Sequence, residues 1–210
     1  MRIVLASSNP GKLREFRAAL SDLGLELVAM EAVGLRALPS ETGFSYAENA
    51  LLKAATAALH SGLPALADDS GLEVEALGGA PGLYSARFGG EGLSDGERCA
   101  YLLSRLKETP REARAARFVS VIALAMPSGT FEVFEGVCEG TILLGPRGDG
   151  GFGYDPAFFS PELGKTFAEA ELSEKQRVSH RGRALAQLAA WLRKPAAWKV
   201  LRETIAPREA

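Results

Sequence analysis

Residues 117–138, RFVSVIALAMPSGTFEVFEGVC, contain two runs of strand-forming residues joined by a turn. The first run, 117–126, is largely apolar, and the second, 130–138, alternates apolar and polar residues. Between them, Pro127–Gly129 has the composition of a tight connection, so the stretch predicts a β-hairpin. An antiparallel pair in the middle of the chain argues against a fold built only from βαβ units.

The rest of the chain alternates strand and helix patterns. Strands are expected at residues 2–7, 25–30, 64–67 and 72–77, and helices at 13–23, 45–60, 94–106 and 179–193, with a last short helix after Pro195. We therefore expect an α/β fold with an elongated mixed β-sheet flanked by helices. Residues 1–210 are expected to form a single domain of two lobes with a central cleft.

Composition limits the possible partners. With 210 residues and 47% hydrophobic content, the chain can bury a core, and its net charge of -2 gives no general attraction for nucleic acid. No apolar run approaches the roughly 18 residues needed to cross a bilayer. Residues 1–4 lead into a strand pattern rather than a signal sequence, so we expect a cytoplasmic protein with no membrane or nucleic-acid partner.

A polar turn joins the first expected strand to the first helix. It consists of Ser7, Ser8, Asn9, Pro10, Gly11 and Lys12. Backbone N–H groups, hydroxyls, an amide and an ammonium at a helix N-terminus can together bind a phosphate. The turn is not a Walker A loop, because the first glycine is missing and Leu13 replaces the Ser or Thr. The alternative is an ordinary capped helix start.

Two adjacent carboxylates, Asp68 and Asp69, follow an apolar run and precede Ser70. Successive side chains of an extended segment point to opposite faces, so only one of them should reach a given site. Mg²⁺ usually takes one or two carboxylates, and Glu41 is the candidate for the second. The alternative is a solvated acidic turn.

Polar residues on the helix expected at 45–60 share one face. Asn49, Lys53, Thr56 and His60 recur at spacings of four, three and four. Such a stripe is either a solvated face or, if it points into a cleft, a place where Lys53 neutralises phosphate charge and Asn49 orients a neighbour. His60 is expected near the helix end.

The glycines in residues 148–153 match the GxGxxG pattern, but they enter a strand-like segment, 154–159, instead of opening a helix. The dinucleotide-binding fingerprint is therefore rejected. The same glycines would let Phe152 and Tyr154 approach a planar ring while Asp155 accepts hydrogen bonds from it. The alternative is a glycine-rich turn that packs two aromatic rings into the core.

Basic residues gather where two helical patterns meet, namely Lys175, His180 and Arg181, together with Ser179. Cations at a helix N-terminus are electrostatically misplaced, which suggests that they await an anion or a carbonyl group. Donors there could bind a 6-oxo purine and would face the wrong group in a 6-amino purine. The alternative is an exposed basic turn.

Together these segments resemble the non-canonical purine nucleoside triphosphate pyrophosphatase family, also called ITPases or XTP/dITP diphosphatases. The motifs that carry the resemblance stand in the family's order and spacing: SSNPGK (7–12), ETGFSYAENALLKA (41–54), ADDSGL (67–72), LGGAPGLYSAR (77–87), GGFGYDPAFF (150–159), GKTFAE (164–169) and SHRG (179–182). The resemblance implies Mg²⁺-dependent hydrolysis of ITP, dITP and XTP to the monophosphate and pyrophosphate by a homodimer. The tail beyond Pro195 extends past the usual end of the family.

The resemblance also assigns roles to residues. Residues 7–12 match the phosphate turn, Glu41 and Asp69 the metal carboxylates, and Asp69 also the catalytic acid-base residue. Ser70 matches a substrate contact, and Lys53 a lysine near the phosphates that we include as catalytic. The purine pocket is matched by Phe152, Gly153, Tyr154, Asp155, Lys175, His180 and Arg181.

An unperturbed aspartate, with a pKa of about 3.9, is a weak general base at neutral pH. We therefore expect Mg²⁺ to polarise the scissile phosphate and acidify the attacking water, which Asp69 orients. Lys12, Lys53 and Lys175 would stabilise charge on the phosphates. Two other functions stay open: a phosphatase that releases orthophosphate, and a non-catalytic nucleotide-binding module.

Overall fold

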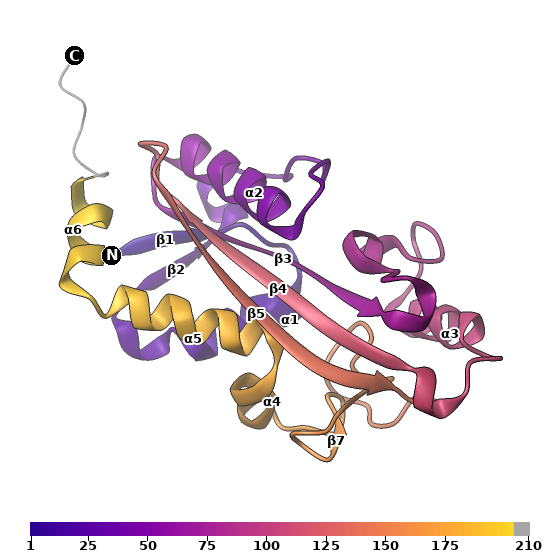
Figure 1. The fold of residues 1–210 in the computed structure, drawn as a ribbon. Coiled ribbons are helices and arrows are strands. Elements are labelled where there is room, and N and C mark those ends of the chain that lie inside the picture. Colours follow the sequence, from indigo (N-terminus) through magenta and orange to yellow (C-terminus); the bar gives the residue numbers. More distant parts are fainter. Residues whose placement is uncertain (204–210) are drawn as a thin grey trace. The chain divides into compact units, whose positions relative to one another are not determined.

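A computed structural model describes residues 1–203 (Figure 1). Positions 204–210, the end of the C-terminal tail, lie outside the described residues. In chain order, the strands and helices are β1 (Arg2–Leu5), α1 (Pro10–Ala19), β2 (Glu26–Ala29), α2 (Tyr46–Ser61), β3 (Ala65–Val74), α3 (Asp95–Arg105), β4 (Ala115–Ala125), β5 (Phe131–Ile142), β6 (Phe158–Ser160), β7 (Lys165–Thr166), α4 (Leu172–Val178), α5 (His180–Leu192) and α6 (Pro195–Glu203).

The strands form one mixed sheet in the order β2-β1-β3-β4-β5-β6-β7. β1 pairs in parallel with β2 and β3, whereas β5 with β6 and β6 with β7 are antiparallel. The predicted hairpin is confirmed, because β4 and β5 are consecutive neighbours and Met126 N–H donates to Thr130 O at 2.9 Å. The predicted α/β class, with a mixed sheet and flanking helices, is therefore confirmed. No helix among residues 1–203 is long and apolar enough to cross a membrane.

The chain divides into two compact units. The first contains residues 1–69, 121–135 and 184–203, and the second contains residues 70–120 and 136–183. The prediction of a single two-lobed domain with a central cleft remains a prediction.

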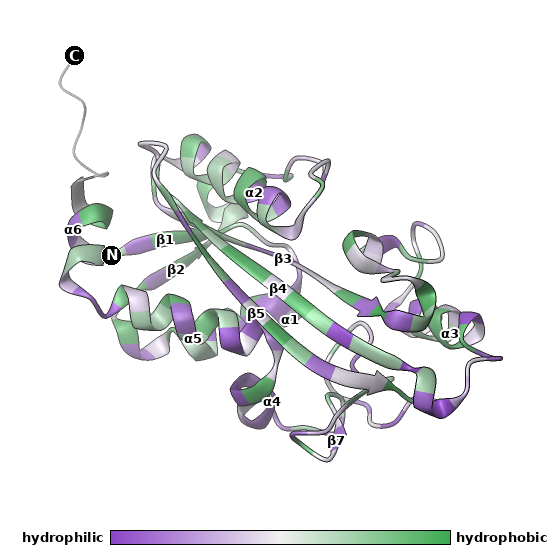
Figure 2. Ribbon diagram, viewed as in Figure 1, coloured by the Kyte–Doolittle hydropathy of each residue, from purple (hydrophilic) through white to green (hydrophobic). Residues whose placement is uncertain are grey.

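Two apolar cores lie in the first unit. One contains residues of β1, α1 and α5, and the other contains the alanines of α2. β4 contributes to both, since Ile122 and Leu124 join the first core while Val121 and Ala123 join the second. This explains the largely apolar run in the sequence, which Figure 2 shows as the green colour of β4.

Helix α2 is positioned by its small residues. Ala50, Ala54, Ala57 and Ala58 are fully buried at helical spacing, so the helix packs its alanine face in the second core. Ser45 caps the N-terminus by accepting the Glu48 N–H at 3.1 Å. The predicted bounds are correct to within one residue.

Two predicted elements are wrong. The strands expected at 64–67 and 72–77 are a single strand, β3, so the acidic stretch lies inside a strand and not in a turn. The strand-like segment 154–159 is mostly turn, and only β6 is a strand there. In both cases backbone pairing, which the local sequence does not reveal, decides the structure.

Candidate active site

The ammonium of Lys53 lies between two carboxylates of the first unit. Its Nζ is 2.7 Å from Glu41 Oε1 and 2.8 Å from Asp69 Oδ1. It also donates to the carbonyl oxygen of Asp68 at 2.9 Å. Lys53 and Asp69 are buried and Glu41 is half-buried. The structure thus brings together the two predicted metal ligands and the predicted catalytic lysine.

Burial and charge act in opposite directions on these groups. Burial raises the pKa of Asp69 to about 6, although the Lys53 ammonium opposes this by stabilising the ionised form. Burial also acts to raise the pKa of Glu41, but Lys53 outweighs it, and the net pKa lies below the ordinary 4.5. For Lys53, burial favours the neutral amine, yet the two carboxylates raise its pKa. Lys53 is therefore charged at neutral pH. Of the two carboxylates, Asp69 has the pKa nearer to 7.

Asp68 and Asp69 have different partners. The Asp68 carboxylate pairs with Lys12 of α1 at 2.6 Å, whereas Asp69 pairs with Lys53 of α2. The two acids therefore reach different lysines, as alternation along an extended strand predicts, and the choice of Asp69 as the metal carboxylate stays a prediction. The Lys12 ammonium also reaches the Asp68 carbonyl oxygen at 3.4 Å.

The predicted phosphate turn is a capped helix start. Asn9 Oδ1 accepts the Lys12 N–H at 3.1 Å, and Ser7 Oγ accepts the Asn9 N–H at 3.2 Å. Pro10 is the first residue of α1, where a missing N–H costs nothing. The first turn of any helix still presents N–H groups without intrahelical acceptors. Phosphate binding by residues 7–12, including exposed Ser8 and buried Gly11, remains a prediction.

The polar stripe of α2 divides into two halves. Asn49 and Lys53 are buried and contact the carboxylates. Thr56 donates to Leu52 O at 2.8 Å, and His60 is exposed near the helix end, as expected. The second half thus matches the solvated face, whereas neutralisation of phosphate charge by Lys53 in the first half stays a prediction.

A second cluster lies in the second unit, around a buried ion pair. Lys175 Nζ is 2.6 Å from Asp155 Oδ2, and both side chains are buried. The same carboxylate oxygen accepts the Phe152 N–H at 2.9 Å. Gly151 makes this possible, because a Cβ there would lie 2.1 Å from Asp155 Oδ2 and its φ is +71°. The ammonium also lies 4.7 Å from the centre of the half-buried Phe152 ring.

The basic helix start belongs to the same cluster. Arg181, buried in the first turn of α5, donates from Nη2 to Ser70 Oγ at 2.7 Å, and its Cζ is 5.6 Å from the Phe152 ring centre. His180 is also buried, so the exposed basic turn is wrong. Five predicted residues of the purine pocket thus gather in one place with Ser70: Phe152, Asp155, Lys175, His180 and Arg181.

Tyr154 has a different position. It is buried in the core of the second unit, and its hydroxyl donates to Ser85 O at 2.8 Å. Burial raises its pKa far above the ordinary value, so the hydroxyl stays neutral. For this residue, the alternative of a ring packed into the core is correct.

Several supporting residues of this cluster were not predicted. Asp95, in the first turn of α3, accepts the Gly153 N–H at 2.7 Å. The His180 ring stacks on the Phe118 ring with 4.6 Å between their centres, and its centre is 6.4 Å from that of the Phe167 ring. Phe167 stood in the GKTFAE motif, whereas Phe118 lay in the expected strand run 117–126 and Asp95 in the expected helix 94–106, without any role at the site.

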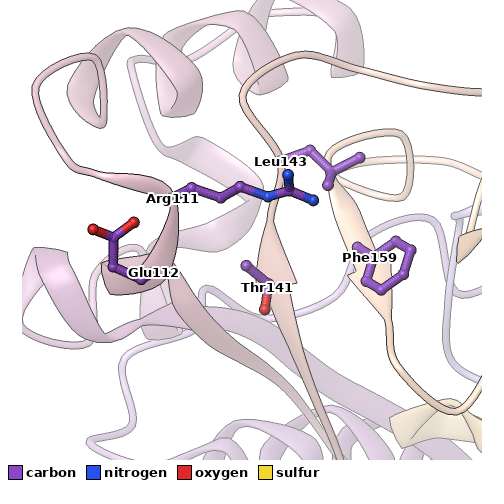
Figure 3. Close-up of a pocket in the computed structure, with 5 residues that line it drawn as sticks. All are labelled: Arg111, Glu112, Thr141, Leu143 and Phe159. Atoms are coloured by element: carbon purple, nitrogen blue, oxygen red, sulfur yellow. The ribbon is translucent and has the colours of Figure 1, made fainter. Parts of the chain in front are cut away.

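A pocket of about 370 Å³ lies elsewhere in the second unit. Its lining residues are Arg111, Glu112, Thr141, Leu143 and Phe159 (Figure 3). None of the predicted site residues lines this pocket. Its lining residues are therefore different from those of the cluster around Lys175 and Asp155.

The donor atoms of the first cluster suit a hard cation. Among residues 1–203, no group of three or more His, Cys, Asp and Glu side chains could hold a metal alone. Glu41 and Asp69 nevertheless place carboxylate oxygens within 2.8 Å of one nitrogen, so the two oxygens are close together. Two carboxylates match a metal that takes its other ligands from water and substrate phosphates, as Mg²⁺ does.

Comparison with known proteins gives a consistent result. Residues 3–191 match the model of the Ham1 family. The chain is 57% identical over 188 residues to a protein from Thermus thermophilus named dITP/XTP pyrophosphatase, with 90% of each chain covered. It is 51% identical to the protein of the same name from Deinococcus radiodurans, covering 90% of this chain and 92% of the other. A solved HAM1 protein from Coxiella burnetii superposes with a TM-score of 0.83 at 43% identity, over 91% and 98% of the chains.

Proposed function

Because this chain belongs to the Ham1 family, we propose that it hydrolyses dITP and XTP, and also ITP, to the nucleoside monophosphate and pyrophosphate. Its relatives named dITP/XTP pyrophosphatase cover nearly the whole of this chain. Such an activity removes damaged purine nucleotides from the nucleotide pool.

The observation that carries the proposal is the contact of Lys53 with Glu41 and Asp69. A protein that only stores or senses nucleotides has little need of two carboxylates held together on one buried lysine. We propose that Glu41 and Asp69 hold Mg²⁺, which when bound supplies a Lewis acid for the phosphates and acidifies a water.

Asp69 is the proposed proton acceptor. A general base works best when its pKa lies near the working pH, and burial brings the pKa of Asp69 to about 6. One Asp69 oxygen accepts the proton of the attacking water as the new bond to phosphorus forms and pyrophosphate leaves.

The lysines have separate proposed roles. Lys12 lies in the first turn of α1 and would add positive charge to the helix N-terminus that receives the phosphates. Lys53 keeps Glu41 and Asp69 together before the substrate arrives. The contacts of Lys175 with Asp155 and Phe152 favour a role at the purine over one at the phosphates.

The second cluster is the proposed purine site. Phe152 offers a half-buried ring for stacking, while Arg181 and His180 are buried donors suited to a 6-oxo group. A 6-amino purine would present its own N–H donors to these donors and leave them without an acceptor. Sites of this kind can discriminate between two substrates by about 10⁴ in kcat/KM. Tyr154 would support the loop from the core without stacking on the base.

The direct test is turnover of dITP, XTP, ITP, dATP and dGTP by the purified chain, with Mg²⁺ or with EDTA. Pyrophosphate and orthophosphate are measured separately. We expect pyrophosphate from dITP, XTP and ITP with Mg²⁺ only, and a decrease of roughly 10²–10⁴ in kcat for Asp69→Asn. dATP tests the need for a 6-oxo group, whereas dGTP, which also has a 6-oxo group, tests whether its 2-amino group is excluded. Orthophosphate as the first product would indicate a phosphatase. Ligand-dependent thermal stabilisation without turnover would indicate a binding module.

We also propose that the chain acts as a cytoplasmic homodimer. Light scattering after size-exclusion chromatography measures the mass in solution. A monomer at micromolar concentration would exclude the dimer.

A further inference from the structure

Asn49 links the two carboxylate-bearing segments of the first cluster. Its side chain is buried in the first half of α2. Oδ1 accepts the Gly43 N–H at 2.8 Å, and Nδ2 donates to Asp69 Oδ2 at 3.3 Å. Because a backbone N–H can only donate, the contact with Gly43 fixes which end of the amide faces Asp69.

We propose that Asn49 is a positioning residue that sets the orientation of the Asp69 carboxylate and the place of the segment carrying Glu41. This inference rests on the proposed function of Asp69 and Glu41. It adds a residue that would act through them without touching the substrate.

The carboxylate of Asp69 is held on both oxygens. Lys53 donates to Oδ1 at 2.8 Å and Asn49 to Oδ2 at 3.3 Å, so the two contacts together define the plane of the group. Lys53 alone would leave the carboxylate able to rotate about its single bond to Cβ. A fixed plane would leave the remaining lone pairs of Asp69 in a constant direction, available to a metal and a water.

The segment 41–43 is attached to the start of α2 by close contact. A Cβ on Gly43 would lie 2.8 Å from Asn49 Oδ1 and 2.7 Å from Glu48 Cβ, so only glycine fits. The next residue is held as well, because Phe44 N–H donates to Glu48 Oε2 at 2.6 Å. Asn49 thus connects the segment of Glu41 to Asp69 through one amide group.

A double-mutant cycle tests this role. Misplacing a catalytic group by about 1 Å can cost roughly 100-fold, so we expect Asn49→Ala to lower kcat for dITP by about that factor, with a smaller change in KM. If Asn49 acts through Asp69, the same substitution in an Asp69→Asn background lowers the residual kcat by less than about twofold. Equal losses in the two backgrounds would overturn the proposal.

Two further measurements separate positioning from folding. Asn49→Asp keeps an acceptor for the Gly43 N–H but replaces the donor to Asp69 by another buried carboxylate, so we expect a low kcat and a melting temperature that falls as the pH rises. The kcat is therefore compared at a temperature at which circular dichroism shows both chains folded. An unchanged kcat in this variant would refute the inference. Thr56→Ala, on the same helix, serves as the control and should retain full activity.

Binding of Mn²⁺, measured by electron paramagnetic resonance without substrate, gives a readout that does not need turnover. We expect Asn49→Ala to weaken Mn²⁺ binding by about 10-fold, as is usual when a group that orients a metal ligand is lost. Unchanged Mn²⁺ affinity would count against the proposal. If the unmodified chain made no pyrophosphate from dITP, the proposed function would fail, whereas full activity of Asn49→Ala would refute only the role of Asn49.

Discussion

Replacing Asp69 by asparagine should stabilise the protein at neutral pH while removing its activity. The pKa of Asp69 is about 6 in the folded chain and 3.8 is its ordinary value, because burial penalises the ionised form. A folded-state pKa above the unfolded one means that the folded chain binds more protons, so this group's contribution to stability falls as the pH rises from about 4 to 6. Above about pH 6, Asp69 is ionised in both the folded and the unfolded chain, and the folded chain bears the full cost of burying the charge.

The size of the effect follows from the same values. At about 1.36 kcal/mol for each pH unit of the difference, ionised Asp69 costs about 3 kcal/mol at pH 8 and about 1 kcal/mol at pH 4.5. An asparagine places its amide N–H against Lys53 or Asn49, which costs about 1 kcal/mol at either pH. The quantity to test is therefore the difference: Asp69→Asn should gain about 2 kcal/mol more stability at pH 8 than at pH 4.5.

Urea unfolding in EDTA at the two pH values measures this difference. Asp22→Asn is the matched control, since the bond to Arg193 lowers the pKa of this exposed carboxylate. Its contribution is present above about pH 4 and lost only in stronger acid, so the control should show almost no difference between pH 4.5 and pH 8. If Asp69→Asn changed stability equally at both pH values, the carboxylate would not be penalised by burial, and its suitability as a general base would lose its physical basis.

Three other perturbations have defined outcomes. Lys53→Met leaves Glu41 and Asp69 without their shared cation, and should cost about 3–5 kcal/mol in urea unfolding; a loss below about 1 kcal/mol would contradict this. Gly151→Ala forces a Cβ against Asp155, and should raise KM for dITP by at least about 10-fold while leaving pyrophosphate as the product, as steady-state kinetics will show. Burial raises the pKa of Cys138 to about 11, so a thiol reagent at pH 8 should label it only after unfolding, and rapid labelling of the native chain would argue against its burial.

Local sequence patterns predicted those parts of the fold that depend on interactions between residues close together in the chain. The N-cap of α2 and the turn of the β4–β5 hairpin are set by residues close in sequence. The residues 68–71, in contrast, have the composition of a turn, yet lie within β3 because neighbouring strands and the lysine partners of the two acids hold them extended. Such long-range pairing leaves no signature in a single segment.

The site shows the same limit. Spacing alone placed Asn49 and His60 on one stripe, but it could not show that the start of α2 lies beside Asp69 while its end does not. Lys175 and Asp155 were both predicted at the purine, yet nothing in sequence revealed that they pair with each other. The sequence indicated which residues belong to the candidate site, but only the folded structure shows which of them contact each other.

Lys12 and Lys53, on two different helices, both donate to the carbonyl oxygen of residue 68. That acceptor belongs to the main chain, so no amino-acid replacement at position 68 can delete it. A replacement there would remove the 2.6 Å ion pair of Lys12 with the Asp68 side chain but would leave the main-chain acceptor in place. Lys53 would keep its 2.9 Å bond to that oxygen through any such replacement, whereas Lys12 would retain only the longer bond of 3.4 Å.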